Sequence, residues 1–134
     1  MKLNHIDLHV GDVQRTAAFF ERYFGFALRT SRTSPAIAIL DDGDGFVLVL
    51  QRAKDDAYTY PDGFHVGFLV DDEEQVIAFQ AAARRDGLDV SDVDRNARGV
   101  MTYCRAPGGI LVEVSYRART SSGSNVADAN DRDV

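Results

Sequence analysis

The strongest constraint on how this chain folds is a segment that occurs twice. Residues 3–10 read LNHIDLHV and residues 63–70 read GFHVGFLV, so a short alternating run with a histidine near its start occurs in two places. Each copy leads into an aspartate and then into a pattern typical of an amphipathic helix. Chains that contain one module twice often build a site between the two copies. His5 and His65 are therefore the first candidates for functional residues.

The first module, residues 1–52, is predicted to form a strand, a helix and three more strands. Alternation along residues 3–10 places apolar side chains on one face of the strand and titratable side chains on the other: His5, Asp7 and His9. Asp12 is suited to cap the helix that follows, and Gly25 is suited to end it. Further strands are predicted at 26–31, 36–40 and 46–51.

The second module, residues 63–119, repeats this order after a polar linker at 53–62. It is predicted to have a strand at 64–70, a helix from about 72 to 86, and strands near 89–92, 100–105 and 110–116. The two modules would form one α+β domain over residues 1–119, built as tandem βαβββ units. Residues 120–134 are polar and without period, and they are expected to be a disordered tail.

Composition and charge exclude several classes of partner. The chain has 134 residues, 45% of them hydrophobic, which is enough for one domain with a buried core. Its formal net charge is -6, and no cluster of Lys and Arg is long enough to follow a phosphate backbone, so neither nucleic acid nor a membrane surface is expected as a partner. No signal peptide or membrane-spanning run is recognisable, and with the single Cys104 this favours a cytoplasmic protein.

A carboxylate completes a possible metal site. When the last strands of the two modules are aligned by their preceding turns, Glu113 corresponds to Val49, and the alternation places Glu113 on the same side as His5 and His65. A carboxylate within an apolar strand is costly unless it is paired or bound to a cation. Two histidines and one carboxylate on neighbouring strands match the ligand set of a divalent metal with positions left open for substrate or water.

The order of these segments resembles the vicinal oxygen chelate superfamily, which includes glyoxalase I, extradiol dioxygenases, fosfomycin-resistance proteins and bleomycin-binding proteins. The resemblance covers about residues 2–116. It is carried by NHIDLHVGDVQRTAAFFERYFGF from Asn4, FHVGFLVDD from Phe64 and RAPGGILVEVS from Arg105. The third stretch departs from the Asp-Pro-Asp-Gly turn that the family commonly has.

The resemblance implies both a fold and a site. Paired modules would form an open, cup-shaped mixed β-sheet with the helices outside. The metal ligands would be His5, His65 and Glu113, and the ion would be divalent iron, manganese, zinc or nickel. The resemblance also implies a homodimer, often with each site shared between chains, and a small-molecule substrate or ligand.

Departures from individual members narrow the reaction. Glyoxalase I-like proteins have a glutamate at the position of Val49, where it binds metal and takes part in proton transfer. Valine can do neither, and Gln51 is a weak substitute for a general base. Fosfomycin-transferring enzymes have a tyrosine that matches Tyr103, but their threonine two residues after the first ligand is Asp7 here, and an acidic side chain repels a phosphonate.

Extradiol dioxygenases use the same set of two histidines and one glutamate for ferrous iron. Around such a set, the candidate catalytic residues are Asp7, His9 and Tyr103, acting on the ligands or on the substrate. His9 is also readily explained as a hydrogen-bonded residue at a strand end, and Tyr103 as an aromatic of the core.

These observations predict a metal-dependent enzyme of the glyoxalase or dioxygenase type, in the broad sense of a lyase, dioxygenase or transferase. It would act on a small oxygen-chelating substrate and would not be a typical glyoxalase I. The alternative is a protein of the bleomycin-resistance type that sequesters an antibiotic or a hydrophobic metabolite without chemistry.

Overall fold

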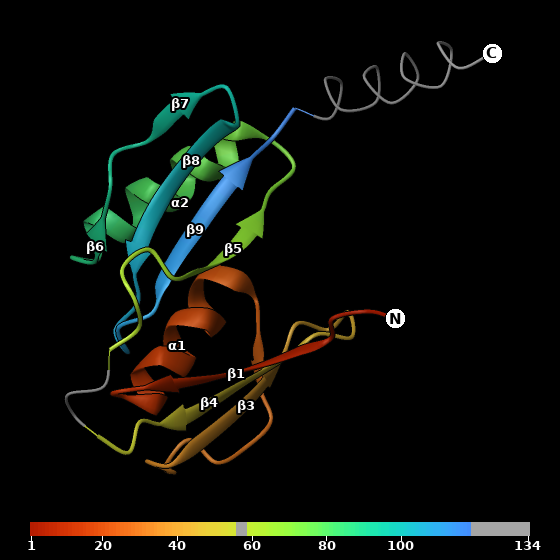
Figure 1. The fold of residues 1–134 in the computed structure, drawn as a ribbon, viewed down its shortest axis with the longest axis vertical. Coiled ribbons are helices and arrows are strands. Elements are labelled where there is room, and N and C mark those ends of the chain that lie inside the picture. Colours follow the sequence, from red (N-terminus) through yellow and green to blue (C-terminus); the bar gives the residue numbers. More distant parts are fainter. Residues whose placement is uncertain (56–58, 119–134) are drawn as a thin grey trace.

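The computed structural model describes residues 1–55 and 59–118, which form two modules of similar plan (Figure 1). The first contains β1 (His5–Val10), α1 (Val13–Phe24), β2 (Ala27–Leu28), β3 (Ile37–Asp41) and β4 (Val47–Arg52). The second contains β5 (His65–Leu69), α2 (Glu73–Arg85), β6 (Asp89–Val90), β7 (Asp94–Asn96), β8 (Gly99–Arg105) and β9 (Leu111–Tyr116). The predicted α+β class is confirmed. The tail predicted at 120–134 lies outside the described residues.

Each module folds its strands into an open sheet of its own. The strand order is β1-β4-β3-β2 in the first sheet and β5-β9-β8-β6 in the second, where β7 also pairs with β8. The histidine strands β1 and β5 lie at sheet edges, and each pairs in parallel with the last strand of its module. The repeat seen in the sequence is therefore a repeat of topology.

Capping residues set the ends of the two helices. Oδ1 of Asp12 accepts a hydrogen bond from the backbone N–H of Arg15 at 3.1 Å, and Gly25 ends α1 with a φ of 69°, which residues with a side chain rarely adopt. Asp72 caps α2 in the same way, through the N–H of Gln75 at 2.9 Å. Both predicted helices are confirmed. Neither helix, nor any other in the described residues, has the length and apolar character needed to cross a membrane.

The helical sides of the two modules meet at a junction of aromatic side chains. Phe24 of α1 stacks on Phe68 of β5 with ring centroids 3.9 Å apart, and Tyr23 meets Phe79 of α2 at 5.6 Å. The Tyr23 hydroxyl also donates a hydrogen bond to Asp86, at the end of α2. As Figure 1 shows, α1 lies between the first sheet and the second module.

On β1, the face opposite the helical side is left more open. In β1, Leu8 and Val10 are buried, whereas the side of His5, Asp7 and His9 is exposed. This confirms the alternation predicted for the strand. The titratable side chains of β1 therefore lie on the face that turns away from the helices.

Two strands differ from the predictions. β7 is absent from the predicted elements because all three of its residues are exposed and polar, which is not a strand pattern. It forms by pairing with β8, where Asn96 is opposite Gly99 across a two-residue turn. β2 is shorter than predicted and ends at Leu28. Beyond that point, the backbone N–H of Ile39 in β3 donates its hydrogen bond to the side chain of Thr30 and not to a backbone carbonyl of β2.

Candidate functional site

His65 and Glu113 form a close pair on the face of the second sheet that turns away from α2. Gly67, two residues beyond His65, is the register partner of Glu113, and nothing lies within 4 Å of where a Cβ of Gly67 would be. Nε2 of His65 lies 3.1 Å from Oε2 of Glu113. Glu113 is 5% exposed, whereas the His65 side chain is 39% exposed. Two of the three predicted ligands therefore lie together, one buried and one facing solvent.

The hydrogen bonds of His65 determine which of its nitrogens can bind a cation. Nδ1 lies 2.7 Å from the backbone carbonyl of Gly63, and because a carbonyl can only accept, Nδ1 carries a proton. In the neutral ring, Nε2 then has a free lone pair that faces a carboxylate oxygen. Two acceptors so close to each other need a proton or a cation between them.

Tyr103 lies beside this pair. Its ring packs edge-on against the ring of His65 with centroids 5.8 Å apart, and it is the register partner of Glu113. Burial, and then the hydrogen bond to Glu113, raise the pKa of the Tyr103 hydroxyl, while Arg98 acts in the opposite direction. Tyr103 therefore stays protonated at neutral pH and can donate a hydrogen bond.

His5 occupies the equivalent position of the first module but has different neighbours. Its Nδ1 lies 2.7 Å from Oδ1 of Asn4, so Nε2 is again the nitrogen left for another ligand. Two residues beyond His5, Asp7 pairs with Val49 of β4, so the last strand of this module has no carboxylate at the position of Glu113. In the part of the chain that the structure describes, no group of three His, Cys, Asp or Glu side chains could hold a metal ion. His5 is thus not joined to the pair on the second sheet.

Asp7 and His9 form a second polar group on the face of β1 that carries His5. Oδ2 of Asp7 accepts a hydrogen bond from Nε2 of Gln51 at 2.5 Å, and Oδ1 lies 3.6 Å from Nε2 of His9. The side chains of Asp7 and His9 are 42% and 45% exposed. They can contact a molecule on this face, but Tyr103, the third predicted catalytic residue, lies on the other sheet.

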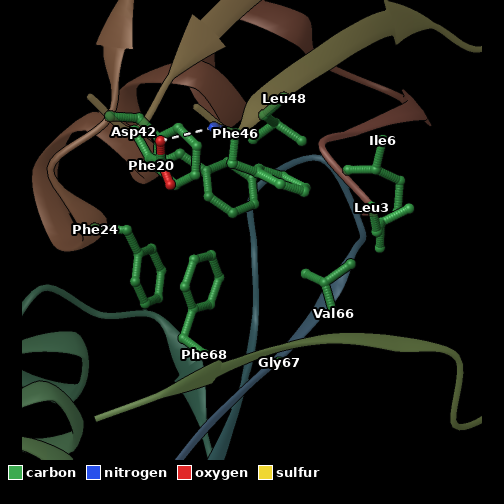
Figure 2. Close-up of a pocket in the computed structure, with 11 residues that line it drawn as sticks. Leu3, Ile6, Phe20, Phe24, Asp42, Phe46, Leu48, Val66, Gly67 and Phe68 are labelled. Atoms are coloured by element: carbon green, nitrogen blue, oxygen red, sulfur yellow. Dashed lines mark hydrogen bonds between the residues drawn. The ribbon is translucent and has the colours of Figure 1, made fainter. Parts of the chain in front are cut away.

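A separate cavity of about 650 Å³ lies on the helical side, between the two modules. Figure 2 shows the rings of Phe24 and Phe68 on one side of it and Val66 on the same strand as Phe68. Because side chains alternate along a strand, Val66 and Phe68 of β5 face this cavity while His65 points to the other side of the sheet. The cavity is therefore distinct from the pair of His65 and Glu113.

Sequence reasoning missed the groups that orient the two histidines. Nδ1 of His5 is held by the side chain of Asn4, whereas Nδ1 of His65 is held by the backbone carbonyl of Gly63. Because the two partners differ in kind, no shared sequence motif indicates them. It also missed Arg98, whose position beside Tyr103 depends on the hairpin of β7 and β8. The cavity has no sequence signal either, because its phenylalanines are equally typical of a core.

The model of the Glyoxalase/Bleomycin resistance protein/Dioxygenase superfamily matches residues 2–114. Among curated proteins, none matches the chain. A solved structure described as a possible glyoxalase from Bacillus cereus is 36% identical, with a TM-score of 0.77, over 86% of this chain and 98% of that one.

More distant structures share the fold. The lactoylglutathione lyase from Agrobacterium tumefaciens is 18% identical, with a TM-score of 0.68, over 86% of this chain and 92% of its own. The fosfomycin resistance protein FosX from Listeria monocytogenes is 19% identical, with a TM-score of 0.73, over 90% of this chain and 96% of its own. Since the family model spans both modules, the chain belongs to the Glyoxalase/Bleomycin resistance protein/Dioxygenase superfamily, the vicinal oxygen chelate proteins that its motifs resemble.

Proposed function

We propose that the protein is a metal-dependent enzyme that acts on a small substrate able to chelate a divalent ion through neighbouring oxygens. The observation that carries this proposal is the distance of 3.1 Å between Nε2 of His65 and Oε2 of Glu113. Glu113 is buried, and an uncompensated negative charge is costly at such a position. Membership of a superfamily that contains enzymes supports the same reading.

The donor atoms of the pair fit a divalent metal ion. Nε2 of His65 offers a lone pair because Nδ1 donates to the Gly63 carbonyl, an arrangement typical of metal-binding histidines. Ligands about 2.1 Å from one ion and at right angles to each other lie roughly 3 Å apart, close to the separation observed. Nitrogen and oxygen donors suit iron, manganese, zinc and nickel alike.

His5 from a second copy of the chain would complete the set of three ligands. Within one chain His5 is on the other sheet, and no third ligand joins the pair among the described residues. Both histidine strands are sheet edges, whose unpaired backbone groups favour association with another chain. We therefore propose a homodimer with shared sites.

A bound divalent ion would supply Lewis-acid polarisation of the substrate oxygens. The residues of the chain would do the rest. Tyr103, held protonated, can donate a hydrogen bond to Glu113 or to a substrate oxygen. Asp7 and His9, which follow His5 on β1, are exposed enough to orient the substrate from the other side. Val49 offers no fourth ligand, which argues against a typical glyoxalase I.

Metal content tests the ligand assignment. Chelator-treated protein would be refilled with each of the four ions, and the bound metal measured by mass spectrometry. The wild type is expected to hold about one ion per chain, and Glu113→Ala and His65→Ala close to none. Glu74→Ala, which removes an exposed carboxylate from the first turn of α2, is the matched control and should keep its metal. Stoichiometric metal in Glu113→Ala would show that the assignment is wrong.

Mixing two inactive variants tests whether sites are shared. If His5 of one chain meets Glu113 of the other, a heterodimer of His5→Ala with Glu113→Ala has one intact site and one doubly defective site. With random exchange of subunits, about one quarter of all sites would then be intact and would bind metal. A mixture that binds no more metal than the separate variants would show that His5 and Glu113 of different chains do not share a site.

Sequestration without chemistry is the second candidate. It is favoured by half-exposed apolar side chains on the open face of the first sheet: Ile37, Ile39, Val47 and Val49. Thermal shifts with aromatic ligands after complete metal removal would separate the two functions. Sequestration predicts stabilisation by the ligand without metal, and loss of that stabilisation in Val49→Asp. The hypothesis of a metal-dependent enzyme predicts that the metal ion raises the melting temperature.

A further inference from the structure

The partly open cavity at the junction of the two modules is large enough to hold a small molecule. Its volume of about 650 Å³ lies within the roughly 300–1,000 Å³ of small-molecule sites. Its walls come from both modules, with Ile6 and Leu48 on one side and Val66 and Phe68 on the other. A molecule bound there would displace water from apolar surface that the fold leaves uncovered.

Aromatic rings form much of the wall, from five phenylalanines: Phe20, Phe24, Phe26, Phe46 and Phe68. The rings of Phe24 and Phe68 are nearly parallel, at 14°, and Figure 2 shows them beside the open space with Phe20 and Phe46 across from them. The face of an aromatic ring carries partial negative charge and attracts cations, most strongly where water is excluded. Such a wall favours a hydrophobic ligand that is positively charged over one that is neutral or negative.

Asp42, an exposed residue, adds an acidic side chain to the rim of the same cavity. It lies in the turn between β3 and β4, where its Oδ1 accepts hydrogen bonds from the backbone N–H groups of Asp44 at 2.8 Å and Phe46 at 3.0 Å. Its Oδ2 accepts no hydrogen bond within residues 1–55 and 59–118. Among the residues that line the cavity, Asp42 is the one ionisable group, so no Lys, Arg or His of the lining neutralises it.

We propose that this cavity binds a hydrophobic organic cation, such as an arylalkylammonium, phosphonium or quaternary ammonium compound. The phenylalanine wall would take the apolar body of the ligand, and Asp42 would pair with its charge. This site goes beyond the proposed function, because it lies on the opposite side of β5 from His65 and uses none of the proposed metal ligands.

Two ions of the same shape and opposite charge provide the test: tetraphenylphosphonium and tetraphenylborate. The chain contains no tryptophan, so Leu3→Trp at the exposed rim of the cavity introduces a single fluorescent reporter. Titrations would use chelator-treated protein at an ionic strength of about 0.15 M, which screens the general attraction of a negatively charged protein for cations. Asp42→Asn keeps the acceptor oxygen of the turn, and Asp44→Asn, an exposed residue outside the lining, changes the net charge equally.

The phosphonium ion is expected to bind one per chain, at least about tenfold more tightly than the borate ion, and to shift the fluorescence of the introduced tryptophan. Asp42→Asn should weaken phosphonium binding by about two- to fivefold, while Asp44→Asn leaves it unchanged, and thermal melts would establish that both variants are folded. Equal binding of the two ions, no binding of the phosphonium ion, or equal effects of the two substitutions would each overturn the proposal. Because metal is absent throughout, none of these results depends on the ligands of the proposed metal site.

Discussion

Replacing Gly108 with alanine is expected to strain the junction between the two modules. Gly108 lies in the turn between β8 and β9, and its carbonyl accepts a hydrogen bond from the N–H of Gly11 at 3.3 Å. A Cβ at this position would lie 2.1 Å from Oγ1 of Thr16 and 2.8 Å from Cβ of Val10. Thr16 and Val10 are buried, and the Thr16 hydroxyl is held by the carbonyl of Asp12 at 2.5 Å. The turn that leads into β9 must therefore move.

The size of the effect follows from steric overlap alone, because the backbone of Gly108 is not in the left-handed region. Overpacking of a buried site typically costs about 1–3 kcal/mol. Replacing a glycine also stabilises by about 0.4–1 kcal/mol, since it restricts the unfolded chain. We expect a net loss of about 1–2 kcal/mol in the free energy of unfolding. For a chain of this length that corresponds to a fall in Tm of roughly 4–7 °C.

Urea unfolding followed by circular dichroism would measure the loss. Gly11→Ala is the matched control, because it adds the same methyl group at the same junction but meets nothing within 4 Å. Thr16→Ala removes the closest clashing atom, so the double variant with Gly108→Ala should lose less stability than the sum of the single variants. The reasoning is refuted if Gly108→Ala is as stable as Gly11→Ala, or if the two substitutions are strictly additive.

Three further predictions concern single residues. The hydrogen bonds from Tyr23 and Arg22 lower the pKa of Asp86. Their contribution to stability is therefore present above the usual aspartate pKa near 3.8 and is lost as the pH falls through the lower pKa of the folded state. Urea midpoints measured from pH 6 downward should fall less steeply for Asp86→Asn than for the wild type. Burial raises the pKa of the Cys104 thiol to about 11, so a thiol reagent at pH 8 should label the protein in urea and leave the folded protein unlabelled, and rapid labelling of the folded state would contradict this burial. Asp12→Ala removes the cap of α1 and should cost about 1 kcal/mol in a chemical melt, whereas Asp12→Asn should cost much less, and equal losses would show that charge matters more than the hydrogen bond.

Much of the fold could be predicted because its signals are local. The alternation of β1 depends on neighbouring residues of one strand, and the ends of α1 depend on Asp12 and Gly25. β7 could not be predicted, because three exposed polar residues become a strand through pairing with β8 and not through any preference of their own. Position 108 shows the same limit, because it leaves no room for a side chain where two distant segments of the chain meet.

The candidate site could be predicted in part, for a related reason. That Glu113 and His65 share a face follows from alternation along two strands, and the structure places them 3.1 Å apart. Whether His5 joins them depends on how whole modules are arranged, within one chain or between two, and no local pattern encodes this arrangement. The cavity beside Asp42 also forms only where the two modules meet. In the sequence, its phenylalanines therefore cannot be distinguished from ordinary core residues.

The two modules keep the histidine of the repeat but place the neighbouring carboxylate on different strands. In the first module, Asp7 on β1 pairs with Val49 on β4. In the second, Gly67 on β5 pairs with Glu113 on β9. The residue pair two positions beyond each histidine thus contains one carboxylate. It lies on the first strand in the first module and on the last strand in the second module.

The surroundings of the two carboxylates argue for different roles. Glu113 is buried and faces His65, so a cation there would compensate a charge that water reaches poorly. Asp7 is exposed and already accepts a hydrogen bond from Gln51, so a cation there would have to displace an existing partner and water. The binding free energy of the same ion is therefore more favourable beside Glu113 than beside Asp7. For this reason a site with three ligands, in which Asp7 contacts the substrate and not the metal, is a better proposal for this chain than a site with four.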